Sequence, residues 1–517
     1  MKQRKKRPLP PPGPMDAPPP MSAEDEMMEM PPMPSPLVDS SDPVYLERHA
    51  LAQALQEQSA LEGFVLLKNN GCLPLKNRRI NVFGRHADLF FDPDRCQEHG
   101  VEVNRELYQV YHAFRTRDAG YTGSGWDRRT GQYVRQNRTS TGMFGGMGNL
   151  DHEPFIGYEV RNDDGSVRVE AMDPAILERA KEFSDTAVVV LYRQGGEGAD
   201  HEKGDETLSE GECGMLACCT AHFPCTVVIL ACNSVIDGDF LVQDTTQEFY
   251  MYTYGGGVYS NNVGNEVLAD FESRVELRYV DGDGQPAPHV YPIQAGRIGG
   301  VFYTCNKPGD RGPEALLKLL LGEASPSGRL MDEIVYDFDD NPASRLCGGL
   351  VLSRQTTGDH RYIYGHNFVA YKEGVYLGYK YFETFRPDRV AFPFGYGLTY
   401  TDFAYSDLRL DRAVYPADGT VRASFTLTNT GRRAGTEVVQ VYVRDLVGSV
   451  TRPVKELKHF ERVHLAAGES HSLTVEIPVA DLAFWGLDGR KKVEPGDFQL
   501  WVAGDSASGE PVGFQVK

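Results

Sequence analysis

The sequence is short of basic charge and has no long apolar run, and both features restrict the classes of protein it can belong to. Its 517 residues include 53 Lys and Arg against 73 Asp and Glu, which gives a formal net charge of -20 at pH 7. Affinity for nucleic acid comes mainly from basic side chains that displace counterions, so we exclude a nucleic-acid partner. No run of about eighteen apolar residues occurs, and we therefore expect neither a transmembrane helix nor a membrane partner.

The amino-terminal stretch MKQRKKRPLPPPGPM also lacks the unbroken apolar segment of a secretory signal, because Pro and polar residues follow its basic cluster. We therefore expect a soluble, cytoplasmic protein. Residues 1–44 are rich in Pro, Met and acidic side chains and poor in large apolar ones, a composition that predicts a disordered tail.

Cysteine pairs with metal-ligand spacing are absent too. The nine cysteines contain no CxxC pair, and five of them crowd between Cys213 and Cys232, where reduced core thiols are favoured over a metal site. His86, His201 and His222 are irregularly spaced, which favours structural histidines over ligands. We expect no metal and no cofactor.

From Tyr45 to about Tyr400, helical and apolar segments alternate. Helical spacing of Leu and Ala runs from Tyr45 to Leu67, and non-alternating apolar runs follow at Ile80–Gly84, Ala187–Tyr192, Thr226–Ala231 and Gly300–Thr304. Further helices are expected at 175–184, 210–223 and 313–322. Uninterrupted apolar strands suit a parallel sheet covered on both faces, so we predict an α/β fold, an open α/β sandwich. Residues 87–169 and 244–295 break this rhythm and are predicted to be insertions or long loops on the active face.

Residues 401–517 change to a period of two. The segments VRASFTLTNTG, EVVQVYVRD, SHSLTVEIP and DFQLWVAG alternate apolar and polar residues between turn-forming residues. This pattern predicts an antiparallel β-sandwich.

One glycine-rich acidic loop, from Arg193 to Glu212, follows the apolar run AVVVLY. Loops that leave the carboxyl ends of strands carry the ligand sites of open α/β sheets. The loop lacks the GK[ST] ending of a phosphate cradle, and its acids would repel a phosphate. On composition alone the acids form a solvated loop. The glycines beside Glu197 favour a sharper hypothesis, because they let a substrate approach a carboxyl group whose pKa desolvation would raise.

Eight segments, taken together and in order, resemble the carboxyl-terminal portion of glycoside hydrolase family 3, the β-glucosidase and β-xylosidase family. They are EGFVLLKNNGCLPL (Glu62 to Leu75), GGEGADHEKGDETLSEGE (Gly195 to Glu212), NSVID (Asn233 to Asp237), GEASPSGRL (Gly322 to Leu330), EGVYLGYKYFE (Glu373 to Glu383), PFGYGLTYTDF (Pro393 to Phe403), TNTGRRAGTEVVQVYV and RPVKELKHFERVHLAAGES. The resemblance implies an α/β sandwich followed by a fibronectin type III-like domain. It also implies a β-linked glucoside or xyloside oligosaccharide as substrate.

The resemblance places the family's general acid/base glutamate at Glu197. Asp200, His201 and Lys203 fall on neighbouring positions of the same motif and are implied as substrate-binding residues. The family often has Arg where this chain has His201, so this position departs from the family's pattern.

The family's nucleophile is an Asp on a separate (β/α)₈ barrel, typically in an SDW-like segment, and the sequence contains no such segment. A barrel needs about 250 residues, for which the predicted domains leave no room. Three hypotheses follow. In the first, the barrel comes from a partner chain or from a continuation of this one, and this chain alone has little glycosidase activity. In the second, the protein is a non-catalytic carbohydrate-binding or regulatory protein. In the third, the insertion supplies its own carboxylate, such as Asp151 or Glu153.

Aromatic residues gather in two further segments. The first segment contains Tyr371, Tyr376, Tyr379, Tyr381 and Phe382. For these residues, packing between the sandwich and its neighbouring domain is favoured over a platform on which sugars stack. The same holds for Phe249, Tyr250, Tyr252 and Tyr254, for which ordinary packing is favoured over a loop lining the site.

Overall fold

The computed structural model describes residues 42–84, 86–119, 125–127, 132–134, 158–161, 167–170, 174–193, 206–232, 236–254, 257–261, 289–304, 309, 311–342 and 373–517. The chain divides into two compact units, Met1–Ala52 and Gln53–Lys517, and the architecture below is that of the second. The predicted disordered tail lies almost wholly outside the described residues.

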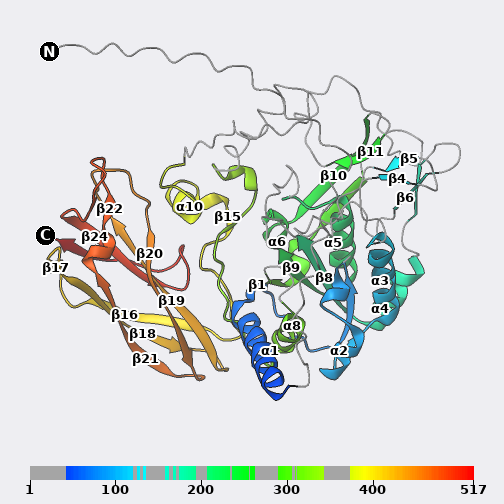
Figure 1. Cartoon of the computed structure of the whole chain (residues 1–517), viewed down its shortest axis with the longest axis horizontal. Helices are drawn as coiled ribbons and strands as arrows, with labels where there is room; N and C mark the ends of the chain where they lie inside the picture. The colour runs from blue at the N-terminus through cyan, green and yellow to red at the C-terminus, as the bar shows by residue number, and fades with distance from the viewer. Residues whose placement is uncertain are drawn as a thin grey trace, which may run out of the picture. The chain divides into compact units, whose positions relative to one another are not determined.

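A six-stranded sheet forms the centre of the α/β domain (Figure 1). Its strands, in spatial order, are β1 (Val65–Asn69), β13 (Ile298–Tyr303), β9 (Cys225–Cys232), β8 (Thr186–Arg193), β2 (Arg79–Phe83) and β3 (Glu102–Val103). All neighbours pair in parallel except β1, which is an antiparallel edge strand on β13. The predicted α/β sheet is confirmed.

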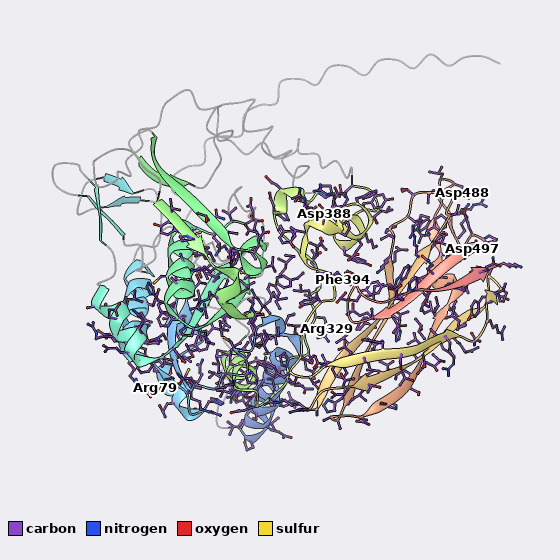
Figure 2. The ribbon with its side chains drawn as sticks, turned by 180° about the vertical axis from the view of Figure 1, so that it is seen from behind. Arg79, Arg329, Asp388, Phe394, Asp488 and Asp497 are labelled. Carbon is purple, nitrogen blue, oxygen red and sulfur yellow. The ribbon has the colours of Figure 1, made fainter. Side chains whose placement is uncertain are left out.

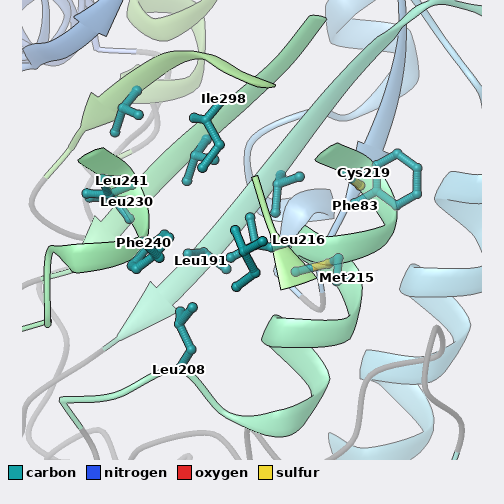
Figure 3. Close-up of a cluster of buried hydrophobic side chains, with 14 of the residues drawn as sticks. Phe83, Leu191, Leu208, Met215, Leu216, Cys219, Leu230, Phe240, Leu241 and Ile298 are labelled. Atoms are coloured by element: carbon teal, nitrogen blue, oxygen red, sulfur yellow. The ribbon is translucent and has the colours of Figure 1, made fainter. Parts of the chain in front are cut away.

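Both faces of the sheet are buried, as the uninterrupted apolar strands predict. In β8, Ala187, Val189 and Leu191 join one buried cluster (Figure 3), whereas Val188 and Val190 join a second. Helices that contribute buried side chains to the first cluster are α3 (Arg105–Ala119), α4 (Pro174–Phe183), α5 (Glu210–His222) and α6 (Asp239–Val242). Those that contribute to the second are α1 (Pro43–Gly63), η1 (Ala87–Leu89), α2 (Pro93–Glu98) and α8 (Gly312–Leu321), together with Tyr108 of α3.

Two predictions about this domain are wrong. The helix expected to run from Tyr45 to Leu67 ends at Gly63, and the apolar residues after it form β1, where they are buried against β13. The insertion expected from Ala87 begins later, because η1, α2, β3 and α3 continue the α/β domain as far as Ala119. The short β3 explains the error, since a two-residue strand leaves almost no periodicity to detect.

The described residues in the remainder of the two predicted insertions include separate antiparallel sheets. They comprise β4 (Gly125–Asp127) with β5 (Gln132–Val134), β6 (Tyr158–Arg161) with β7 (Val167–Glu170), and β10 (Thr245–Tyr254) with β11 (Gly257–Asn261) and β12 (His289–Ile293). None of these described strands pairs with the six-stranded sheet.

The carboxyl-terminal region is the predicted β-sandwich. One sheet contains β16 (Phe403–Leu410), β18 (Thr420–Asn429) and β21 (Ser470–Pro478). The other contains β17 (Val414–Tyr415), β25 (Val512–Val516), β24 (Gly496–Ala503), β19 (Gly435–Asp445) and β20 (Glu456–Leu465). Apolar side chains from both sheets form one core. A hairpin of β22 (Phe484–Trp485) and β23 (Lys491–Lys492) lies outside the two sheets.

The segment between the two domains carries β14 (Ile334–Val335), η3 (Phe338–Asp340), α10 (Tyr379–Phe385), η4 (Pro387–Arg389) and β15 (Val390–Phe392). Arg329, labelled in Figure 2, donates to the Glu437 carboxylate of β19 at 3.0 Å, and both side chains are buried. The Gln440 amide of the same strand donates to the carbonyl of Gly395 at 3.0 Å. Buried polar contacts therefore join this segment to the sandwich.

Candidate active site

The four site residues predicted from the sequence, Glu197, Asp200, His201 and Lys203, lie outside the described residues, as do Asp151 and Glu153. The structure instead defines both ends of the loop that carries the first four. The loop leaves β8 after Arg193 and reaches described structure again at Glu206, just before α5.

This loop leaves the sheet at a topological switch point. From β2 the chain runs to β3 on one side, whereas β8 and then β9 lie on the other side of β2. The connection after β2 packs on one face of the sheet and α5 packs on the opposite face. Such a reversal opens a crevice at the carboxyl ends of the two central strands, where α/β proteins bind ligands.

Aromatic rings meet at this position. His86, which follows β2, stacks on Tyr192 of β8 with ring centroids 4.3 Å apart. Burial raises the pKa of the Tyr192 hydroxyl above its usual value, so the ring stays neutral near pH 7. A structural role for His86 was predicted, and this stacking is consistent with it.

A buried ion pair holds the two ends of the loop together. Arg193 donates from Nη1 to Glu212 Oε1 at 2.5 Å and from Nη2 to Oε2 at 2.6 Å, while the side chains are only 1% and 3% exposed. Arg193 Nη2 also donates to the carbonyl of Thr207 at 3.1 Å. The last residue of β8 is thus tied both to α5 and to the segment that enters α5.

Glu212 also caps α5. It occupies the third position of the helix, and its Oε2 accepts from the backbone N–H of Ser209 at 3.0 Å and from Ser209 Oγ at 3.1 Å. In return, Ser209 Oγ accepts from the Glu212 N–H, which completes a capping box. The Glu212 carboxylate therefore accepts hydrogen bonds both from the residue that caps α5 and from the Arg193 guanidinium.

A second contact reaches the end of the loop from Asp237, which lies between β9 and α6. The backbone N–H of Asp237 donates to the carbonyl of Glu206 at 2.9 Å, and Asp237 Oδ1 accepts from the N–H of Phe338 at 2.8 Å. Burial raises the pKa of Asp237 to about 7, and the carboxylates of Asp337, Glu206 and Asp239 add to the effect, against the Phe338 hydrogen bond that lowers it. A carboxyl group that changes charge near neutral pH lies beside the loop exit.

Sequence reasoning missed Arg193, Glu212 and Asp237 as supports of the site. The signal for Glu212 was present, because Ser-x-x-Glu before a helix predicts a capping box. Nothing in the sequence indicates that Arg193 pairs with Glu212, since that contact depends on how β8 and α5 pack.

The predicted packing of the first aromatic segment against the sandwich is confirmed for Tyr376 and Tyr379, whereas the ring of Tyr381 contacts Phe382 and Phe385 of its own segment. Tyr379 stacks on Phe394 at 4.4 Å, meets Tyr442 of β19 edge-on, and accepts a hydrogen bond from the Leu457 N–H at 3.0 Å. Phe382 is fully buried, and Tyr376 bonds to Thr451 of the sandwich. Tyr371 lies outside the described residues, and of Phe249, Tyr250, Tyr252 and Tyr254 only the backbone strand is described.

Over the residues that the structure describes, no three His, Cys, Asp or Glu side chains converge to form a metal-binding group. No helix in that part of the chain combines the length and apolar character needed to cross a bilayer. The described cysteines are free, and four of them, Cys96, Cys213, Cys219 and Cys232, are buried.

Comparison with known families identifies both domains. Residues 64–256 match the model of the glycosyl hydrolase family 3 C-terminal domain, and residues 437–506 match that of the fibronectin type III-like domain. The α/β domain belongs to the glycosyl hydrolase family 3 C-terminal domain family. The first match contains the predicted site loop with both of its anchors, and the second lies within the β-sandwich.

Curated β-glucosidases are similar to this chain over different shares of its length. The β-glucosidase of Ruminococcus albus is 27% identical over 491 residues, which are 90% of this chain and 40% of that protein. The thermostable β-glucosidase B of Acetivibrio thermocellus is 35% identical over 193 residues, 37% of this chain and 23% of that protein. The chain therefore spans less than half the length of these curated relatives.

The fold itself has a counterpart among solved structures. β-Glucosidase 3B from Thermotoga neapolitana, solved in complex with glucose, superposes with a TM-score of 0.61 and 23% identity, covering 91% of this chain and 54% of that one. At this identity the likeness establishes the fold alone.

Proposed function

We propose that this chain supplies the general acid/base of a β-glucosidase-type glycoside hydrolase, with Glu197 as the proton-transferring carboxyl group. The substrate class is a β-linked glucoside or xyloside oligosaccharide. The observation that carries the proposal is the anchoring of the loop around Glu197, whose two ends are joined by the buried Arg193–Glu212 pair at the switch point of the sheet.

Anchoring of this kind suits an acid that must meet one oxygen atom of a bound substrate. Four glycines at positions 195, 196, 198 and 204 give the loop backbone many accessible conformations. Catalytic groups have to be held within about 0.5 Å of their productive geometry. Fixing both ends of the loop removes much of that freedom while leaving Glu197 between small neighbours, where a sugar ring can approach it. Asp200, His201 and Lys203 are proposed to contact substrate hydroxyls from the same loop.

Retaining glycosidases need a second carboxylate as nucleophile, about 5 to 5.5 Å from the acid. In the proposed mechanism this nucleophile comes from a (β/α)₈ barrel, either on a continuation of this polypeptide or on a separate chain. Glu197 then protonates the leaving oxygen in the first step. In the second step the same carboxylate takes a proton from the water that hydrolyses the glycosyl intermediate.

A second candidate function is carbohydrate binding without turnover. It is favoured by the absence from this sequence of the SDW-like segment that carries the family's nucleophile.

The test combines turnover with covalent trapping. The purified chain is assayed against aryl β-glucosides and β-xylosides, with an intact-mass measurement to show whether a partner copurifies, and is then treated with a 2-deoxy-2-fluoro glycoside. We expect no labelled carboxylate in this polypeptide alone and labelling of a barrel Asp when a family 3 barrel is supplied. Stoichiometric labelling of an Asp or Glu of this chain would overturn the split site and favour Asp151 or Glu153. Glycan binding without turnover under either condition would support the carbohydrate-binding candidate.

A further inference from the structure

Asp237 joins two segments that are far apart in the chain. Its backbone N–H donates to the carbonyl of Glu206 at 2.9 Å, and its Oδ1 accepts from the N–H of Phe338 at 2.8 Å. Glu206 is the residue at which described structure resumes after the site loop, and Phe338 begins η3 in the segment between the two domains. A displacement of η3 would therefore reach the exit of the site loop through this one residue.

Gly238 brings the backbone beside Asp237 close to β14 and β15. Its N–H donates to the carbonyl of Val335 at 2.8 Å. A Cβ atom added to Gly238 would lie 2.6 Å from Ile334 Cγ2 and 3.1 Å from Ala391 Cβ, so no larger residue fits there. The backbone of residues 237 and 238 is thus held directly against both strands.

The two strands belong to the buried core of the α/β domain. β14 and β15 pair with each other, and Ile334 of β14 and Phe392 of β15 are buried in one hydrophobic cluster. The same cluster contains Ile236 and Phe240, which lie on either side of Asp237 in the chain. Because interiors of this kind are close-packed, they transmit displacement instead of absorbing it. The contact of Asp237 with η3 therefore has a rigid support.

We propose that Asp237 is a positioning residue for the acid/base loop, which it fastens at the loop's exit to the segment between the two domains. This inference rests on the proposed role of Glu197. A catalytic group has to be held within about 0.5 Å of its productive geometry, and a misplacement of about 1 Å can lower the rate about 10²-fold. Asp237 acts through the loop: it exchanges no proton with substrate and needs only an oxygen that accepts from the Phe338 N–H.

The first test compares variants of the full chain assembled with a competent barrel. Asp237→Ala removes the acceptor of the Phe338 N–H, so kcat for a natural disaccharide should fall by about 10- to 100-fold, with KM nearly unchanged. Activated aryl glycosides should lose much less, because their departure needs little protonation. Asp237→Asn keeps an oxygen acceptor of the same shape and should restore most of kcat, as a positioning role requires.

Asp337→Ala is the matched control. It removes a comparable hydrogen bond, 2.9 Å from Asp337 Oδ1 to the N–H of Asp339, at the start of the same helical turn. Because that bond lies within η3 and does not reach Glu206, kcat should stay as in the wild type.

Hydrogen–deuterium exchange of the chain alone gives a second readout that needs no turnover. The N–H of residue 237 reports the bond to Glu206, and the N–H of Phe338 reports the bond to Oδ1. Asp237→Ala should lower the protection of both, whereas Asp237→Asn and Asp337→Ala should lower neither. Loss of protection at Phe338 alone would show that the loop exit is held without the Asp237 side chain, and would overturn the proposal.

The kinetic test can also contradict it. An unchanged kcat in Asp237→Ala, or an equal loss for disaccharides and aryl glycosides, would rule out a positioning role in proton transfer. If the wild-type assembly shows no turnover, the proposed function fails instead, and the protection of the residue 237 N–H alone decides whether Asp237 holds the loop exit.

Discussion

Removing the charge of Arg193 should destabilise the fold far more than removing a surface charge. In Arg193→Met the Glu212 carboxylate, whose side chain is 3% exposed, loses both guanidinium donors and keeps only its contacts to Ser209. An unpaired charge left buried in this way costs about 3 to 5 kcal/mol. Glu212→Leu leaves the guanidinium unpaired and removes the capping box as well, which adds about 1 kcal/mol.

The double variant Arg193→Met/Glu212→Leu should recover most of this loss, because neither charge then remains buried. Urea unfolding of the wild type, the two single variants and the double variant gives the coupling free energy directly. The matched control is Arg422–Glu476, a cross-strand pair of the β-sandwich with a comparable 2.7 Å contact but side chains 45% and 57% exposed. Its coupling should be far smaller, because solvent screens an exposed ion pair. Equal coupling energies for the two pairs would refute the buried-clamp reasoning.

Two further predictions concern residues around the site. Gly84→Ala should lower the free energy of unfolding by on the order of 3 kcal/mol, because the φ of Gly84 is 108° and the new Cβ would lie 2.3 Å from the Val190 carbonyl oxygen. Gly63→Ala, where a Cβ would meet open space, should change it little. Urea unfolding compares the two variants, and equal losses of stability would contradict the close packing at Gly84. The pKa of Asp237, raised to about 7, contributes stability that is fully present below pH 3.8 and is lost as pH rises to about 7. Asp237→Asn should therefore be more stable than the wild type at pH 8, on the order of 1 to 4 kcal/mol, and the two should converge near pH 4. A constant difference across this range would show that Asp237 does not titrate as described.

Much of the fold was predictable because most strands of the sheet are long, apolar and bounded by turn residues. The segments around β8, β9 and the β-sandwich strands carry their own periodicity, which local sequence displays. The edge strand β1 was not predictable in this way, because its apolar residues continue the helical spacing of α1 across Gly63. Only pairing with β13 distinguishes strand from helix there.

The site was predictable only in part. The motif indicates Glu197 and its neighbours, but a motif does not show what holds them. Arg193 and Glu212 are nineteen positions apart, and their contact depends on the packing of α5 against β8. Pairings between distant side chains follow from tertiary structure and leave no periodic signal in the sequence.

The most direct test of the account is the leaving-group dependence of Glu197→Gln, with Glu202→Gln in the same loop as matched control, in the chain assembled with a competent barrel. Glutamine keeps the shape of the side chain and removes its transferable proton. Turnover of a natural disaccharide, a poor leaving group, should fall by about 10² to 10⁴. The glycosylation rate of an activated aryl glycoside should fall much less, and azide should partly restore its turnover, while Glu202→Gln should leave both substrates nearly unaffected. If Glu197→Gln slowed every substrate equally and azide had no effect, Glu197 would not be the acid/base, and the acidic loop would be a solvated one.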